Sequence, residues 1–392
     1  MASPARTGEA AVVVVGVAEQ EAAVVEERRE EEEQAAAGVA AVLLPVGMVM
    51  VQVFTAVTLL LSELALGAGA ARPLVLLVYR NLVGAAAVAP LAVLFERGMM
   101  KKMNAVVCGW ISINATFGVL LATGMYYYGL RDTNAAYSAN FLNLIPIVTF
   151  IIAVIFRAEK LAIASWAGRM KVLGTVLSVS GTMVVSLFRG QLLHLWPTHL
   201  LRLGSHAAAA APPSSPAGTT ISGTLLLCGS CLNYALWFIV QAKLAKVFPS
   251  KYWATVLTCL SGSLQALVAG VLTTGDWSEW KISWDLRLLA VAYSGVFNTG
   301  ITFVLISWAI TRRGPIYPSM FNSLSLIITT VMDSLLLGAN IYLGSVIGAL
   351  LIIVGLYAFL WGKGKELQLK AAQGVPKQEE RHKAAGDDDP EI

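Results

Sequence analysis

The chain has 392 residues, of which 57% are hydrophobic and 13% charged, and its net charge is +4. A soluble domain carries about 25% charged residues, so this composition excludes an ordinary soluble protein and indicates one that crosses a membrane several times. The small net charge gives no reason to expect a nucleic-acid partner, and the expected partners are the lipid bilayer and a small solute.

The first 42 residues are rich in Ala, Val and Glu and carry an acidic run from Glu26 to Glu33. This run stands where a secretory signal peptide would have a cleavage site flanked by small residues. We expect residues 1–42 to form a disordered cytosolic tail, with a short surface helix as the alternative.

Apolar stretches of roughly 20 residues follow, which is the length that a helix needs to cross a bilayer core of ~30 Å. Helices are expected because open strands would leave backbone polar groups unpaired in lipid. The pattern predicts an all-α, polytopic membrane protein with ten transmembrane helices: residues 43–66, 74–95, 104–128, 136–156, 170–188, 221–241, 252–274, 288–309, 315–337 and 341–361.

Lys and Arg are divided unevenly between the loops, with twelve in the loops on one side and six on the other. Short cytosolic loops carry the excess of these residues, so both termini are predicted to be cytosolic. Residues 189–220, polar and then rich in Ala, Pro and Ser, are predicted to form a flexible non-cytosolic loop. The charged residues 363–392 are predicted to be a cytosolic C-terminal tail.

An internal repeat organises the spans. The segment Tyr137–Leu161 returns, with changes, 180 residues later as Tyr317–Ile341. A fixed period indicates one unit used twice, here residues 43–188 and 221–362. Because each unit has five helices, the two repeats are predicted to insert with opposite orientations, as in many secondary transporters whose site lies at the repeat interface. A duplicated scaffold or receptor that transports nothing is the alternative.

Polar groups at membrane depth are costly and usually face the interior of the bundle. Arg80 lies about seven residues into the second span, where its guanidinium would match a carboxylate on a solute. The alternatives are a side chain that extends to the interface and an ion pair with Glu63. Four asparagines are predicted to line a cavity, although each could instead bond a neighbouring helix: Asn140, Asn143, Asn298 and Asn322.

Two acids are candidates for proton coupling. Asp333 lies within the second repeat, and a buried carboxyl group can hold and release a proton. Glu63, near the non-cytosolic end of the first span, is the other candidate. A hydrated acid that takes no part in transport is the alternative for Asp333. Among Tyr126, Tyr127 and Tyr128, which we interpret mostly as interface aromatics, one is expected to face the path.

No nucleophile motif, nucleotide-binding loop or metal signature is present in the sequence. Cys228 and Cys231 have a metal-type spacing, but they lie in an apolar stretch and no second pair accompanies them. We therefore expect that the protein is not an enzyme and that it has no cofactor and no metal site.

Several motifs, taken together, resemble one known family: Leu77-Val78-Tyr79-Arg80, Phe95-Glu96-Arg97, Met320–Leu326 and Gly355-Leu356-Tyr357 with Leu360–Glu366. They are similar to the plant nodulin-like, walls-are-thin-related (UMAMIT) transporters, which are EamA-type members of the drug/metabolite transporter superfamily. The resemblance covers roughly residues 43–366. It implies two EamA repeats of five helices and facilitated or proton-linked transport of small organic solutes, amino acids first. Auxin or other plant metabolites are the alternative cargo.

The chain departs from the family pattern at several places, among them two motifs. Ala339 stands where the family usually has Glu, and Ala122-Thr123-Gly124 replace a run of Asn-Gln-Asn in the third span. The second change removes candidate ligands for an amino acid.

The plasma membrane is the expected location, with the vacuolar membrane as the alternative, and a homodimer is left open.

Overall fold

The computed structural model describes residues 28, 38–40, 42–59, 61, 73–133, 138, 141–142, 144–156, 158, 165–188, 191–193, 217–273, 280, 286–332, 334–335 and 341–386. The chain divides into two units, Met1–Gly47 and Met48–Ile392. The described residues of the first unit are helical, and the second unit contains the helix bundle. Four of the predicted site residues lie outside the described ranges: Glu63, Asn140, Asn143 and Asp333.

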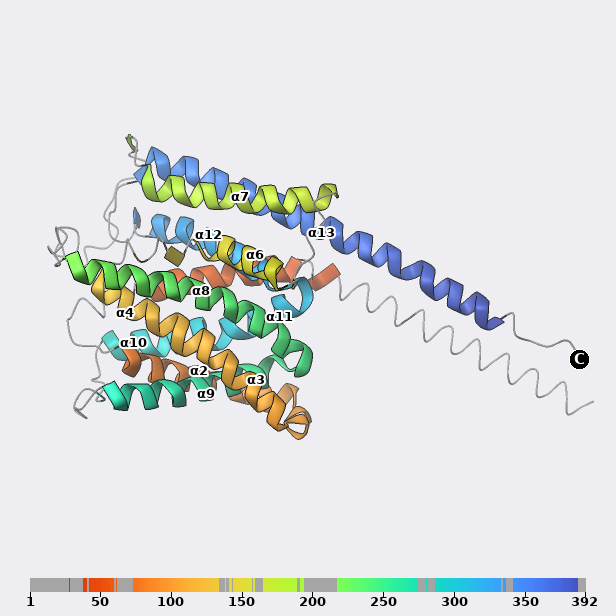
Figure 1. Ribbon diagram of the computed structural model, residues 1–392, viewed down its shortest axis with the longest axis horizontal. Helices are drawn as coiled ribbons and strands as arrows, with labels where there is room; N and C mark the ends of the chain where they lie inside the picture. The colour runs from red at the N-terminus through yellow and green to blue at the C-terminus, as the bar shows by residue number, and fades with distance from the viewer. Residues whose placement is uncertain are drawn as a thin grey trace, which may run out of the picture. The chain divides into compact units, whose positions relative to one another are not determined.

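The described part of the bundle is helical apart from one pair of two-residue strands (Figure 1). The elements are α2 (Pro73–Phe95), η1 (Met99–Lys102), α3 (Ala105–Ala115), η2 (Thr116–Thr123), α4 (Gly124–Asp132), α6 (Ile145–Ile155), α7 (Trp166–Leu187), β1 (Leu192–Leu193), α8 (Ala217–Val247), α9 (Lys251–Thr273), α10 (Leu286–Tyr293), η4 (Ser294–Ile301), α11 (Thr302–Arg313), α12 (Ile316–Met332), β2 (Ile341–Tyr342) and α13 (Leu343–Gly386). The strands pair antiparallel, with Leu192 opposite Tyr342.

Seven helices within the described ranges are long and apolar enough to cross a membrane: Gly38–Leu59, Pro73–Phe95, Ala105–Leu130, Ile221–Val247, Lys251–Thr273, Leu288–Arg313 and Leu343–Glu366. Two shorter apolar helices, α6 and α12, fall inside the predicted spans 136–156 and 315–337. The 22-residue helix α7 overlaps the predicted span 170–188. The chain is therefore a helical, multi-pass membrane protein.

Helices α7 and α13 lie side by side and antiparallel, with backbone against backbone (Figure 1). A Cβ atom on Gly174 would lie 2.6 Å from the carbonyl oxygen of Gly355, and one on Gly181 would lie 2.7 Å from that of Gly348. Glycines seven residues apart recur on one helical face, so the sequence itself provides this contact. No larger side chain fits at these positions without moving a backbone.

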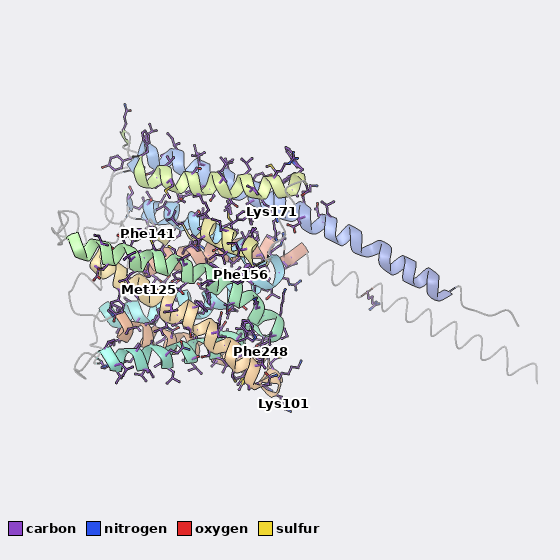
Figure 2. All side chains as sticks on the ribbon, viewed as in Figure 1. Lys101, Met125, Phe141, Phe156, Lys171 and Phe248 are labelled. Atoms are coloured by element: carbon purple, nitrogen blue, oxygen red, sulfur yellow. The ribbon has the colours of Figure 1, made fainter. Side chains whose placement is uncertain are left out.

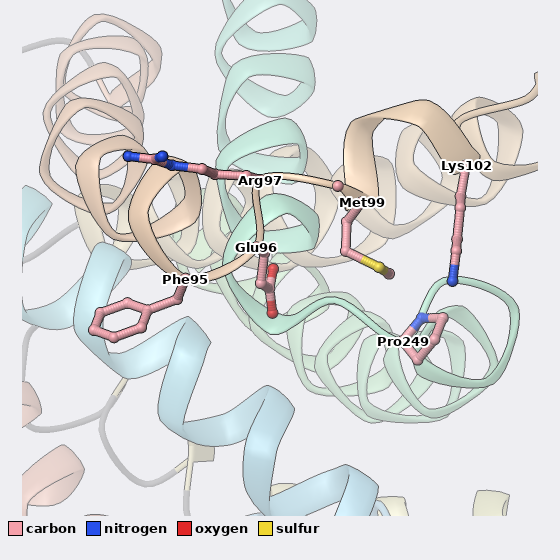
Figure 3. Close-up of a pocket in the computed structure, with 7 residues that line it drawn as sticks. Phe95, Glu96, Arg97, Met99, Lys102 and Pro249 are labelled. Atoms are coloured by element: carbon pink, nitrogen blue, oxygen red, sulfur yellow. The ribbon is translucent and has the colours of Figure 1, made fainter.

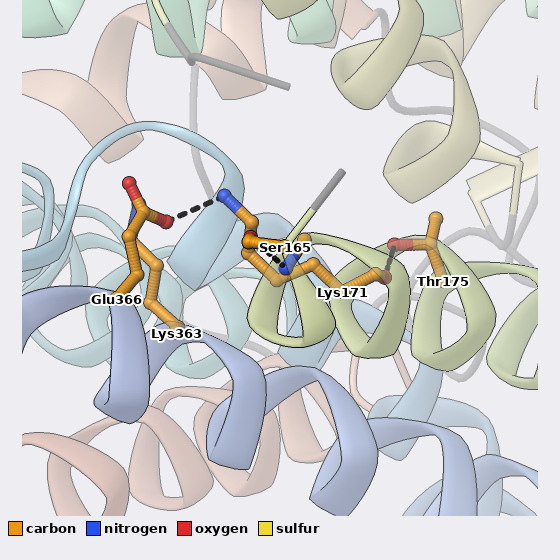
Figure 4. A network of polar contacts seen from close by, with 6 residues as sticks. Ser165, Lys171, Thr175, Lys363 and Glu366 are labelled. Atoms are coloured by element: carbon orange, nitrogen blue, oxygen red, sulfur yellow. Dashed lines mark hydrogen bonds and ion pairs between the residues drawn. The ribbon is translucent and has the colours of Figure 1, made fainter. Parts of the chain in front are cut away.

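An ion pair closes one end of the α7–α13 contact (Figure 4). The Lys171 Nζ lies 2.6 Å from the Glu366 Oε2, and Lys171 is only 2% exposed. Lys363 contributes a second ammonium 3.9 Å from the same oxygen. In the same network, the Ser165 hydroxyl accepts a hydrogen bond from the Gly168 N–H and caps the start of α7. A charge buried this deeply requires such partners.

A second antiparallel pair joins α2 to α9. The Glu96 carboxylate, just beyond α2, accepts hydrogen bonds from the Ser250 hydroxyl and from the backbone N–H groups of Lys251, at 3.2 Å, and Trp253, at 3.3 Å. The Trp253 indole N–H donates back to the Glu96 carbonyl oxygen at 3.0 Å. Glu96 thus helps to satisfy the N–H groups of the first turn of α9, where the Ser250 hydroxyl also accepts from the Trp253 N–H at 3.1 Å.

At the opposite end of the same pair, Leu74 of α2 lies near Gly270 of α9. The Tyr79 hydroxyl donates to the carbonyl oxygen of Trp280 at 2.8 Å. Tyr79 therefore ties α2 to Trp280, whose ring lies against Gly270 of α9.

The glycine contact gives a first prediction. Gly355→Ala is expected to destabilise the protein by about 1–3 kcal/mol, because the new methyl group meets the α7 backbone at Gly174 and Ser178. The measurement is the thermal unfolding temperature of detergent-purified protein.

Gly109→Ala is the matched control, because a Cβ atom there has nothing within 4 Å. Because Ala has a higher helix propensity than Gly, this substitution should leave the unfolding temperature unchanged or raise it slightly. Equal unfolding temperatures for the two variants would contradict the tight α7–α13 contact.

Candidate functional site

Arg80 is the central residue of the candidate site. It lies seven residues after Pro73, the first residue of α2, which places it about 10 Å along the helix. Its Nε–H donates to the Thr299 hydroxyl at 2.6 Å, and its Nη1 donates to the Tyr127 hydroxyl at 2.9 Å. No carboxylate of the described residues lies within ion-pair distance of the guanidinium. The charge is therefore held by two neutral groups.

A glycine brings the partner helix close enough to make this contact. Gly84 follows Arg80 by one turn, and a Cβ atom on it would lie 3.0 Å from both the Gly295 carbonyl oxygen and the Thr299 Cγ2. A larger residue at position 84 would push η4 away from α2, and the hydroxyl of Thr299 would move out of reach of Arg80.

Thr299 lies in η4, one of two π-helical segments of eight residues that the structure describes. The segments η2 and η4, eight residues each, interrupt the long helices 105–132 and 286–313. η2 packs on α8 and α9, whereas η4 packs on α2. π-Helical insertions are rare and frequently lie at functional sites, because they widen the helix and redirect side chains.

Asn298, next to Thr299 in η4, faces the helix that contains residues 48–59. The Thr55 Oγ1 lies 3.1 Å from the Asn298 Oδ1. One turn earlier on the same helix, the Gln52 Nε2 lies 3.4 Å from the Asn322 Oδ1 of α12. The structure thus brings two of the four predicted asparagines to one helix face, while Asn140 and Asn143 lie outside the described residues.

Aromatic residues of α8 border the Arg80 cluster. The single proton of the Thr123 hydroxyl goes to the Gly118 carbonyl oxygen, at 3.0 Å, so the Tyr234 hydroxyl is the donor in its 3.2 Å contact with Thr123. Tyr234 is also close enough to Arg80 to interact with its charge. Trp237, one turn further on, is 3% exposed and packs against Gly118.

The sequence found only part of this site. Arg80, Asn298 and Asn322 were predicted, and each has a polar partner from another helix. Thr299 and the pair Gln52 and Thr55 were not found, because Thr and Gln are common in ordinary helix contacts. The spacing of three residues between Gln52 and Thr55, which places them on one face, was the available signal.

Two surface hollows lie elsewhere. One, of about 410 Å³, is lined by Phe95–Met99, Lys102 and Pro249 (Figure 3). In this hollow the Glu96 carboxylate already accepts hydrogen bonds from the start of α9, and the side chains of Arg97 and Lys102 point away from each other. The other, of about 180 Å³, is lined mainly by apolar residues of α12 and α13. Neither includes Arg80, so polar contacts between helices define the candidate site.

Comparison with known proteins identifies the family. Residues 43–187 and 221–361 both match the EamA-like transporter family. The chain belongs to this family. Among curated relatives, it is 34% identical to the WAT1-related protein At5g07050 of Arabidopsis thaliana over 79% of this chain and 78% of that protein. It is also 34% identical to the WAT1-related protein At5g64700 of Arabidopsis thaliana over 81% of this chain and 89% of that protein.

One solved crystal structure resembles the EamA-like chain with a TM-score of 0.57 at 16% identity, covering 80% of this chain and 96% of the other. This likeness concerns the fold alone. The relatives confirm the predicted resemblance to the walls-are-thin-related transporters, and family membership makes the protein a membrane transporter.

The contact between Arg80 and Thr299 gives a second prediction. Thr299→Val keeps the shape of the side chain but leaves the Arg80 Nε–H without an acceptor, and a lost hydrogen bond to a charged group costs about 1.5–3 kcal/mol. The unfolding temperature of the purified protein should fall.

Thr302→Val is the control from the same helix. The Thr302 hydroxyl is buried and has no hydrogen-bond partner in the described structure, so its removal should be neutral or stabilising. A Thr299→Val protein as stable as Thr302→Val would show that the Arg80 contact contributes nothing.

Proposed function

We propose that the protein is a facilitator or proton-linked carrier of small organic solutes that bear a carboxylate, with amino acids as the first candidates and auxin or other plant metabolites as the alternative. One observation carries the proposal. Arg80 places a charge within a transmembrane helix, two neutral hydroxyl groups hold it, and no described carboxylate neutralises it. Ionisable groups at such depth are costly and typically belong to substrate pathways.

The geometry of the guanidinium favours a carboxylate partner. Arg has five N–H donors, and Thr299 and Tyr127 occupy two of them. The three that remain include both nitrogens at the end of the group, which can bind the two oxygens of a carboxylate together. The bound solute would supply the negative charge that the described residues around Arg80 lack.

The packing of the helices supports two inverted repeats, residues 43–188 and 221–362. If ten helices form two five-helix units of opposite orientation, the fifth and tenth must be antiparallel, and so must the second and seventh. α7 and α13 occupy the first pair of positions, and α2 and α9 the second, and both pairs are antiparallel. In this arrangement Arg80 and Thr299 meet at the interface between the repeats.

The distribution of basic residues supports cytosolic termini. Lys101, Phe156, Lys171 and Phe248 lie toward one end of the bundle, whereas Phe141 and Met125 lie toward the other (Figure 2). The first end collects the Lys-rich and Arg-rich loops, which are typical of the cytosolic side. We place the carrier in the plasma membrane, with the vacuolar membrane as the alternative.

The role of Arg80 gives a third prediction. Arg80→Ala should lower the uptake of a carboxylate-bearing solute at least tenfold, while uptake of neutral solutes falls less, because only the former lose a charge partner. Arg80→Lys should restore part of the uptake rate, since an ammonium group keeps the charge but cannot bind both carboxylate oxygens as the planar guanidinium does. The assay is radiolabelled uptake and efflux in oocytes, normalised to surface protein, with a panel of amino acids, auxin and neutral analogues.

Arg97→Ala serves as the control, because Arg97 is exposed and bonds only the carbonyl oxygen of Val93 in its own helix among the described residues. Equal losses for charged and neutral solutes in Arg80→Ala would assign Arg80 to folding. A wild-type protein that moves no member of the panel would remove the proposal.

We propose Asp333 as the first candidate for proton coupling, with Glu63 as the second candidate. Asp333→Asn removes the only carboxyl group at that position, so solute flux should no longer respond to an imposed pH gradient. The measurement is the initial flux with the gradient present and then collapsed by an ionophore. A variant with the wild-type pH profile would exclude Asp333 and leave Glu63→Gln as the remaining test.

A further inference from the structure

The inference concerns Asn298 and rests on the proposed function. Its starting point is the Thr55 hydroxyl, which has two oxygen neighbours. The Thr55 Oγ1 lies 2.9 Å from the carbonyl oxygen of Val51 and 3.1 Å from the Asn298 side chain. A hydroxyl group carries a single proton, so it can donate to only one of them.

The Thr55 hydroxyl donates its proton to the Val51 carbonyl oxygen. A helical threonine commonly donates to the carbonyl four residues earlier, and the shorter distance here agrees. An oxygen of Asn298 at 3.1 Å would then face the bare oxygen of Thr55. The two ends of an amide group have nearly the same shape, so their assignment follows from hydrogen bonding. The Asn298 amide nitrogen therefore donates to Thr55, and the amide oxygen is left free to accept.

This assignment puts an acceptor beside a carboxylate receptor. Asn298 and Thr299 are consecutive in η4, so their Cα atoms are about 3.8 Å apart. Thr299 holds Arg80, whereas Asn298 presents an amide oxygen on the neighbouring face of the same segment. A solute that carries a carboxylate and an amino group on one carbon atom has the matching pair of groups at short separation.

We infer that the amide oxygen of Asn298 accepts a hydrogen bond from the amino group of the solute, and that Asn298 is the residue by which the carrier distinguishes α-amino acids from plain carboxylates. Thr55 is a positioning residue, since its oxygen holds the amide nitrogen and so fixes the orientation of the amide. The rings of Phe54 and Phe297, with centroids 5.2 Å apart, lie beside this pair and suit an apolar side chain on the solute.

The test compares phenylalanine with 3-phenylpropionate, which differ only in the amino group. Asn298→Leu should lower phenylalanine uptake about tenfold relative to 3-phenylpropionate, with the change mainly in KM. Asn233→Leu is the matched control, because the Asn233 amide nitrogen donates to the Gly229 carbonyl oxygen of its own helix at 2.7 Å and has no assigned contact with the solute. The ratio of the two uptake rates should stay at the wild-type value in this control.

A second pair of variants covers the case in which Asn298→Leu does not fold. Thr55→Val frees the amide to rotate and should reduce the preference for phenylalanine, whereas Thr55→Ser should keep it. An unchanged ratio in Asn298→Leu, or equal loss of both solutes in all variants, would overturn the inference. If the wild type moves neither solute, the proposed function fails. If the wild type moves both solutes and the variants do not change the ratio of phenylalanine uptake to 3-phenylpropionate uptake, the proposed function stands and Asn298 does not have this role.

Discussion

The hydrogen bonds of Arg80 are the constraint on which the rest of the site depends. A guanidinium inside a membrane helix must be paired, and here the two acceptors come from other helices, one from η4 and one from α4. Thr299 of η4 can reach it because Gly84 lets the backbone of η4 approach α2. Helix packing, the π-helical backbone and the charge are therefore parts of one arrangement, and none of them explains the site alone.

Two kinds of contact hold the bundle around that centre. Close glycine contacts, as between α7 and α13, replace the hydrophobic driving force that lipid does not supply. Polar contacts at the helix ends, such as Glu96 on the start of α9 and Lys171 on Glu366, fix how far each helix extends. Arg80 in the interior differs from these contacts, because it has only neutral partners among the described residues and three of its N–H donors remain available.

The sequence predicted the class of fold because length and composition alone decide whether a segment can cross a bilayer. It also predicted Arg80, Asn298 and Asn322, since a polar residue in an apolar run is conspicuous. It could not predict Thr299 or Tyr127 as partners of Arg80, because such contacts depend on the distance between helices. The two π-helical segments leave no distinctive pattern either: η2 reads as an ordinary apolar stretch, and its Thr123–Gly118 bond appears only in three dimensions.

The seam between α7 and α13 also limits how the protein can move. Sliding one helix along the other by a turn would move Gly174, Gly181, Gly348 and Gly355 away from the backbone atoms that they now contact, and larger residues would meet those atoms instead. We therefore expect the two helices, one from each half of the chain, to stay together as one rigid pair, which the ion pair between Lys171 and Glu366 stabilises at one end. Any alternation that turns the guanidinium first to one aqueous side and then to the other is therefore expected in the remaining helices, which would move relative to the α7–α13 pair.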